Sequence, residues 1–274
     1  MSTLEERLYD AILNNRSEEA LSLLRDNPGL NVNWANENDD QRTALHQAVG
    51  VEIVKALLAH PDINVNCRDR KGHTPFFLLC CAKGGVPVVR LLSKDPHVDV
   101  TLADDGGCTP LWWASRFGNG NTIKWLIASG RDLEDVKNKK GKYEGSTETS
   151  ALEIARKHHR SEAVSLLEMF LAKPALTRHE IRMELGMLNE LAAEVFALTV
   201  FLCDDLLQLK PARAITNNSA VAAATQYFVI AARLPMELQM ILCHRAVGSM
   251  KQNILLKDSE AAFKSLARTR SQSD

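Results

Sequence analysis

The chain reads Asp69-Arg70-Lys71-Gly72-His73-Thr74-Pro75 and continues at once with the apolar run Phe76-Phe77-Leu78-Leu79-Cys80-Cys81. Gly72 favours a tight turn, because glycine tolerates a positive φ. Thr74 has the side chain of a helix cap, and Pro75 falls in a first helical turn, where its missing N–H costs nothing. The pattern predicts a β-turn that leads directly into an apolar helix. A single unit of this kind cannot bury its own apolar face, so the unit is expected to recur.

Related segments do recur along the chain. Thr43-Ala44-Leu45-His46 lies 31 residues before Thr74, and Thr109-Pro110-Leu111-Trp112 lies 35 residues after it. A weaker copy reads Ser150-Ala151-Leu152-Glu153-Ile154-Ala155. Apolar periodicity predicts a second helix behind each of the first three copies. These second helices are expected at Val51–Leu58, Val86–Leu92 and Asn121–Ile127.

The region resembles the ankyrin-repeat family, whose signature is Thr-Pro-Leu-His-x-Ala with a period of about 33 residues. Only the copy at Thr43 keeps the histidine, and Phe77 and Trp112 stand at that position in the next two copies. The resemblance implies an all-α fold, an ankyrin-repeat solenoid of paired helices with projecting β-turns. It would span residues 1–172 as about five repeats, divergent caps included.

A helical C-terminal domain is predicted at residues 174–270, which lack the repeat pattern, and residues 271–274 are expected to be a disordered tail. Thr177 and Glu180 have the spacing of a capping box, so a long apolar helix is expected to begin there. That helix is predicted to end near Leu209 and to be followed by a loop at Thr216–Ser219. A second helix is predicted around Tyr227–Ala231, a third helix from Leu234 and a short last helix from Asp258.

The composition is that of a globular chain, with 274 residues, 45% hydrophobic residues and a net charge of −1. This charge argues against a general binder of nucleic acid or of anionic membranes. The longest apolar stretch, Leu191–Cys203, is too short to span a bilayer. The N-terminus lacks the apolar core of a signal peptide, and the six cysteines show no metal-binding spacing. We therefore expect an intracellular protein, cytoplasmic rather than nuclear.

No pattern in the chain indicates catalysis. His158-His159 are consecutive and do not share a helix face, and Asp204-Asp205 lack a partner acid at a defined spacing. No nucleophile elbow or phosphate-binding loop is present in the sequence. We predict a protein that is not an enzyme, with no catalytic, cofactor-binding or metal-binding residues.

The resemblance implies that the projecting turns and first helices form a concave face that binds a protein partner. The sign of the charge alternates from turn to turn, which suits a protein better than a nucleic acid, although solvated loops also carry such charges. Arg116 and Phe117, of residue types enriched in interfaces, form a candidate anchor pair. The other candidate contact residues are Arg68, Arg70, Lys71, His73, Asp104, Asp105, Lys139, Lys140, Lys142 and Tyr143.

A second resemblance concerns the C-terminal region. Leu234-Pro235-Met236-Glu237-Leu238 looks like the opening Leu-Pro-x-Glu-Leu of an F-box, which in some ankyrin proteins recruits the Skp adaptor of ubiquitin ligases. Proline at a helix start followed by glutamate is also ordinary helix-start chemistry. The main hypothesis is therefore a non-enzymatic protein-binding module, and the alternative is a substrate adaptor of a ubiquitin ligase. The sequence carries no information on the partner's identity or on the oligomeric state.

Overall fold

The structure is a computed structural model that divides into two compact units, Met1–Arg178 and His179–Asp274. The division falls within α11 (Pro174–Glu184). The structure describes residues 3–82, 85–133, 136, 139–143, 147–203, 227–231, 234–249, 251 and 254–271.

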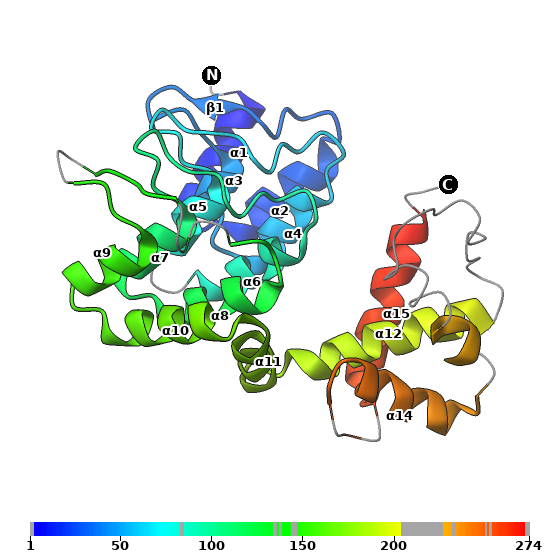
Figure 1. Ribbon diagram of the computed structural model, residues 1–274. Coiled ribbons are helices and arrows are strands. Elements are labelled where there is room, and N and C mark those ends of the chain that lie inside the picture. The colour runs from blue at the N-terminus through cyan, green and yellow to red at the C-terminus, as the bar shows by residue number, and fades with distance from the viewer. Residues whose placement is uncertain are drawn as a thin grey trace, which may run out of the picture. The chain divides into compact units, whose positions relative to one another are not determined.

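The first unit is built from helix pairs joined by projecting turns (Figure 1). A short antiparallel ribbon, β1 (Ala35–Asn36) with β2 (Arg42–Thr43), lies in the first turn, with Ala35 opposite Thr43. The helices are α1 (Leu4–Leu13), α2 (Ser17–Asp26), α3 (Ala44–Gln47), α4 (Val51–Leu58), α5 (Pro75–Cys81), α6 (Val86–Lys94), α7 (Pro110–Phe117), α8 (Gly120–Ser129), α9 (Ala151–Lys157) and α10 (Ser161–Ala172).

The helices of this unit stack in two rows. The first helices of the pairs, α1, α3, α5, α7 and α9, contact one another in order, and so do the second helices, α2, α4, α6, α8 and α10. In Figure 1 the pairs follow one another from blue at α1 to green at α10. The core lies between the rows, and Leu45, Phe76, Leu111 and Ile123 are among its fully buried side chains. The predicted all-α solenoid is confirmed.

Helix starts in the repeats use the expected caps. The Thr74 hydroxyl accepts a hydrogen bond from the backbone N–H of Phe77 (3.2 Å), and that of Thr109 accepts one from Trp112 (3.1 Å). Ser150 and Glu153 form a reciprocal capping box in the weakest copy. Each cap satisfies backbone donors that the first helical turn leaves open. The helices therefore begin where the sequence places them.

The turns before the caps Thr74 and Thr109 are each held by an aspartate, as the first of them shows. Asp69 Oδ1 accepts hydrogen bonds from the backbone N–H groups of Lys71 and His73, both at 2.9 Å. Gly72 between them has a φ of 77°, and a β-carbon there would collide with Asp105 of the next turn. Glycine is required at this position for both reasons.

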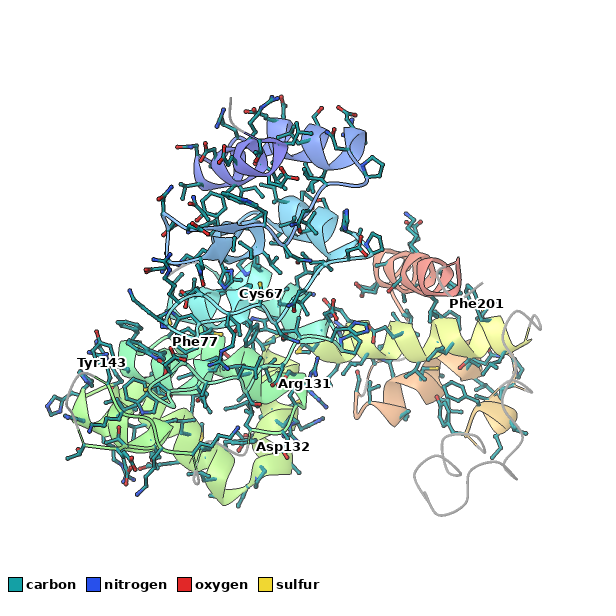
Figure 2. All side chains as sticks on the ribbon, turned by 90° about the horizontal axis from the view of Figure 1, so that it is seen from above. Cys67, Phe77, Arg131, Asp132, Tyr143 and Phe201 are labelled. Atoms are coloured by element: carbon teal, nitrogen blue, oxygen red, sulfur yellow. The ribbon has the colours of Figure 1, made fainter. Side chains whose placement is uncertain are left out.

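The second unit contains α12 (Met187–Cys203), α14 (Met236–Ala246) and α15 (Leu256–Ser271). Helix α12 packs against both others. Ala193 and Ala197 on α12 meet Ala262 on α15, and Phe201, labelled in Figure 2, stacks on Phe263 with 5.8 Å between ring centroids. Small residues let the two helices approach closely, while the aromatic pair fills the space beyond them.

The structure corrects three predictions about the C-terminal region. The helix predicted to begin at Thr177 begins at Pro174, and the Thr177 hydroxyl donates to the carbonyl of Met169 (2.9 Å) instead of capping. Gly186, with a φ of 71°, separates α11 from α12, so the expected long helix is two helices. The last helix is not short, because α15 continues to Ser271, which was assigned to the tail.

Several predicted features lie outside the described residues: the end of the long helix near Leu209, the Asp204-Asp205 pair, the loop at Thr216–Ser219 and the tail residues 272–274. Within the described ranges, no single helix has both the length and the apolarity needed to cross a membrane. Helices α11 and α12 pass that test only as a pair, and the pair is bent by 91°.

Candidate protein-binding surface

The charged side chains of the projecting turns are largely engaged with one another. Arg68 donates to the carbonyl of Ala103 (2.7 Å) and lies 3.7 Å from the carboxylate of Asp105. Lys71 Nζ lies 3.1 Å from the carboxylate of Asp40 in the preceding turn. Alternating charge along the array thus joins neighbouring turns. Exposed ion pairs of this kind contribute about 0–1 kcal/mol each to stability, so their main effect is to hold neighbouring turns in position.

Half-buried His73 and buried Asp69 form a pair in the turn before α5. The His73 ring nitrogen Nδ1 lies 3.0 Å from Asp69 Oδ2, and Arg42 Nε approaches the same oxygen at 3.4 Å. Burial alone would raise the pKa of Asp69, but the hydrogen bonds from the backbone of His73 and Lys71 and from the His73 ring lower it overall. His73 is thus committed to the turn, and its ring stacks on Phe77 with centroids 4.5 Å apart.

Asp104 repeats the role of Asp69 one repeat later. Its Oδ1 accepts hydrogen bonds from the backbone N–H groups of Gly106 (2.9 Å) and Cys108 (2.8 Å). Its other oxygen accepts the indole N–H of Trp113 (3.0 Å). Asp104 is therefore a turn-forming residue that also orients an aromatic ring on the first helix.

Aromatic side chains connect three successive repeats on the row of first helices. Trp113 on α7 lies at the centre, with ring centroids 6.0 Å from Phe77, 5.5 Å from Phe117 and 5.0 Å from Tyr143. Figure 2 labels Phe77 and Tyr143 on this part of the solenoid. Trp113 is only 8% exposed, whereas Phe117 is 41% exposed. The group thus has a buried base and an accessible end.

Arg116 lies on these rings. Its guanidinium carbon is 4.3 Å from the ring centroid of Tyr143, 4.9 Å from that of Trp113 and 6.0 Å from that of Phe117. Cation–π contacts of this kind contribute about 0.5–2 kcal/mol. Among the described residues, no carboxylate lies within ion-pair distance of Arg116. We call Trp113, Arg116, Phe117 and Tyr143 the Arg116 patch.

The segment before α9 carries exposed lysines beside this patch. A β-bridge between Gly141 and Thr149 closes the segment, and the backbone N–H of Lys142 donates to the carbonyl of Gly106 (2.8 Å). Lys139, Lys140 and Lys142 are exposed and make no ion pair with any described residue.

Two buried side chains link repeats at the histidine position of the signature. His46 Nδ1 accepts from the backbone N–H of Thr43 (3.0 Å), and its Nε2 lies 3.1 Å from the carbonyl of His73 in the next repeat. Trp112 donates its indole N–H to the carbonyl of Thr149, also in the next repeat (2.9 Å). The tryptophan thus replaces the histidine in bridging to the next turn. Burial lowers the pKa of His46 despite the hydrogen bond to His73, so the ring is neutral near pH 7.

The described cysteines have the environment of unreactive, buried thiols. Burial raises the pKa of Cys81 and of Cys108 to about 12, and the carboxylate of Asp104 adds to the effect in both cases. No group of His, Cys, Asp and Glu among the described residues has the arrangement of a metal site. An acidic hollow of about 470 Å³ lies at the N-terminal end of the unit, lined by Glu6, Asp10, Trp34, Ala35, Asn36, Glu37 and Asn38.

Comparison with known proteins agrees with this geometry. Residues 50–139 match a family model described as ankyrin repeats, in three copies. The chain contains ankyrin repeats. The match covers α4 to α8, the part of the unit whose turns and caps are most regular. The copies at Thr43 and Ser150, outside that match, continue the same two rows of helices.

Several ankyrin-repeat proteins are similar to parts of this chain. Human Rabankyrin-5 is 29% identical over 134 residues, which are 45% of this chain and 11% of that protein. SMC5-SMC6 complex localization factor protein 1 of Bos taurus is 34% identical over 136 residues, 47% of this chain and 13% of that protein. Human Ankyrin repeat domain-containing protein 63 is 36% identical over 101 residues, 34% of this chain and 25% of that protein. The chain therefore spans a small part of these curated relatives.

The ankyrin register also identifies Trp113, a residue of the surface that is not among the contact residues predicted from sequence. The variable position after the signature histidine is occupied by Gln47, Leu78, Trp113 and Ile154 in successive repeats. Three of these are apolar, and Leu78 and Ile154 belong with Trp113 to one cluster of packed side chains. Aligning the repeats at this position predicts that Trp113 packs with its counterparts, and its spacing of three residues from Arg116 puts both on one side of α7.

Proposed function

We propose that this chain is a non-enzymatic protein-binding module and that the Arg116 patch is the centre of its binding surface. Ankyrin repeats indicate a protein partner. The observation that carries the choice of surface is Arg116, a cation placed over aromatic rings with no carboxylate partner among the described residues. Arginine and aromatic residues together are typical of the residues that dominate interface energies. Exposed Phe117 beside it supplies apolar area that binding would bury.

The proposal gives the turn residues different weights. Arg68, Lys71 and Asp105 are held in pairs between turns, and His73 is held by Asp69. Arg70 is exposed and has no ion-pair partner among the described residues, so of this group it is the one best placed to meet a partner. Lys139, Lys140 and Lys142 would form the rim of the surface.

Affinity capture from cell extract tests this function, with the full chain as bait and mass spectrometry as readout. The proteins retained by the wild type are expected to be lost from Phe117→Ala and Arg116→Glu and kept by Arg25→Glu. The control Arg25 is an exposed cation near the end of α2, with no ion-pair partner among the described residues. Thermal unfolding of each variant checks that the fold is intact. If both patch variants retain the same proteins as the wild type, the Arg116 patch is not the binding surface.

An adaptor role is the second candidate, and side-chain exposure at the start of α14 favours it. Met236 is 60% exposed and Leu238 is 47% exposed, immediately after Pro235. Binding of a purified Skp-type adaptor to the full chain tests this role. The matched pair of variants is Leu238→Asp, expected to abolish binding, and Met183→Asp, an exposed methionine on α11 expected to leave it unchanged. Equal binding by both variants, or none by the wild type, removes this candidate.

A further inference from the structure

The surroundings of the Arg116 patch carry an excess of positive charge. Lys140 and Lys142 are exposed on the segment that carries Tyr143. Arg160 donates from Nε to the backbone carbonyl of Arg116 (3.0 Å), which places a second guanidinium against the backbone at the end of α7. Lys157, at the end of α9, is exposed. From this arrangement we propose that the Arg116 patch binds an acidic peptide segment whose apolar side chain packs on Phe117 and Trp113.

Nearby carboxylates offset only part of this positive charge. Asp104 and Glu153 are held by hydrogen bonds and keep their negative charges, and the pKa of Glu153 is lowered first by the hydrogen bonds from Ser150 and further by the charges of Lys140 and Arg156. Glu162 lies 3.9 Å from Lys124, and Glu168 lies 2.6 Å from Arg156. Glu148 is exposed on the segment before α9, and its negative charge offsets part of the positive charge of the lysines there. The cations Arg116, Lys140, Lys142, Lys157 and Arg160 remain in excess.

The titration of His158 is consistent with a positive potential at this place. Burial lowers the pKa of His158, and the charges of Arg116, Arg160 and Lys157 lower it further. A group of cations that disfavours one more proton on a neighbouring imidazole favours an approaching carboxylate by the same Coulombic interaction. The effect is expected to weaken with added salt, because these cations are accessible to solvent.

The position of Arg116 suits recognition of a carboxylate. Its guanidinium lies against the rings of Trp113 and Tyr143, so the side chain is already ordered before a partner arrives. Less conformational entropy is then lost on binding. A guanidinium presents a planar fork of donors that matches a carboxylate, and this is how arginine makes its strongest pairs.

The apolar part of the patch determines what accompanies the carboxylate. Phe117 is the exposed end of an aromatic group whose base is buried, and Leu78 and Cys81 pack partly exposed against the same cluster. An apolar side chain one or two residues from the acid would cover Phe117 and exclude water from the arginine–carboxylate pair. Excluding water strengthens such a pair, which is why anchors of this kind lie at the centre of interfaces.

A random peptide library tests the proposal, which rests on the proposed function for the location of the surface. Twelve-residue peptides displayed on phage are selected on the full-length wild-type protein and on its variants. The wild type is expected to enrich sequences in which aspartate or glutamate flanks an aromatic or aliphatic residue. In fluorescence anisotropy, the most enriched peptide is expected to bind Arg116→Glu at least about tenfold more weakly and Arg25→Glu as the wild type does.

A second variant separates charge recognition from folding. Lys140→Glu combined with Lys142→Glu changes exposed side chains without ion-pair partners among the described residues, so the fold is expected to survive. This double variant is expected to weaken peptide binding about three- to tenfold and to reduce its salt dependence. Three results would each overturn the proposal that the Arg116 patch binds an acidic peptide: enrichment of neutral or basic peptides, no enrichment at all, or stronger binding of a single-stranded oligonucleotide. If proteins captured by the wild type are still lost from Phe117→Ala, the proposed protein-binding function holds even when the peptide proposal fails.

Discussion

Replacing Asp69 by alanine is expected to destabilise the solenoid far more than replacing Asp105, although both residues lie in projecting turns. The Asp69 side chain is fully buried, accepts two backbone N–H bonds of 2.9 Å and faces the His73 ring at 3.0 Å. Asp105 is 69% exposed and faces Arg68 at 3.7 Å. The comparison therefore separates an aspartate that forms a turn from one that joins two turns.

The magnitude follows from the donors that Asp69→Ala leaves open. A hydrogen bond to a charged group contributes about 1.5–3 kcal/mol, and two backbone N–H groups lose such a partner. Part of this loss is recovered where water reaches the opened turn, so about 3 kcal/mol is expected for the free energy of unfolding. Asp69→Asn keeps one acceptor oxygen and is expected to lose about half as much. Asp105→Ala is expected to cost less than about 0.5 kcal/mol, as for other exposed pairs.

Urea unfolding followed by tryptophan fluorescence measures these differences. All four tryptophans lie in the first unit, so the signal reports the unfolding of the solenoid. The expected order of stability is wild type, Asp105→Ala, Asp69→Asn and Asp69→Ala, with an unchanged dependence on urea concentration. Equal midpoints for the two alanine variants would refute the reasoning, because the turn would then not depend on the buried carboxylate.

Three further predictions concern the links between and within repeats. Trp112→Phe keeps an aromatic ring but removes the indole donor, so the carbonyl of Thr149 keeps only the backbone N–H of Gly141; urea unfolding is expected to show a loss of about 0.5–1.5 kcal/mol, and no measurable loss would mean that the bridge between repeats is dispensable. The lowered pKa of His46 means that the unfolded chain binds a proton more readily than the folded one. Stability is therefore expected to fall as the pH drops below about 6.5, by up to about 1.4 kcal/mol per pH unit; the same slope in His46→Gln would exclude this residue as its source. Gly72→Ala is expected to lower the free energy of unfolding by about 1–3 kcal/mol, because residue 72 has a positive φ and the added methyl group would collide with the next turn. Gly29 has open space around it, so Gly29→Ala is expected to be nearly neutral when both variants are compared by thermal unfolding.

The repeats were predictable from sequence because their signals are local. Thr74, Thr109 and Ser150 cap helices through the backbone N–H three residues on, so a short segment contains both partners. The predicted second helix Val51–Leu58 agrees with α4 at both ends for the same reason. Apolar spacing and caps act over one or two helical turns, and the stacking of repeats reinforces both.

The same local reasoning failed at Thr177. The spacing to Glu180 is that of a capping box, but the Thr177 hydroxyl donates instead to the carbonyl of Met169, at the end of the preceding helix. Arg178, next to it, donates to the carbonyl of Ile127 on α8. Contacts with earlier helices thus keep this segment helical from Pro174 onwards, and a capping pattern cannot reveal such competing partners.

The sequence by itself determined that turns and paired helices repeat and where the first helices of the repeats begin. Tertiary structure decided which charges are already paired. Arg68 and Lys71 meet carboxylates that belong to neighbouring repeats, whereas Arg116 meets aromatic rings and, among the described residues, no carboxylate. The physical reason is distance along the chain: partners about one repeat apart come within 4 Å only when the repeats stack, and the stacking sets which side chains remain accessible to a partner.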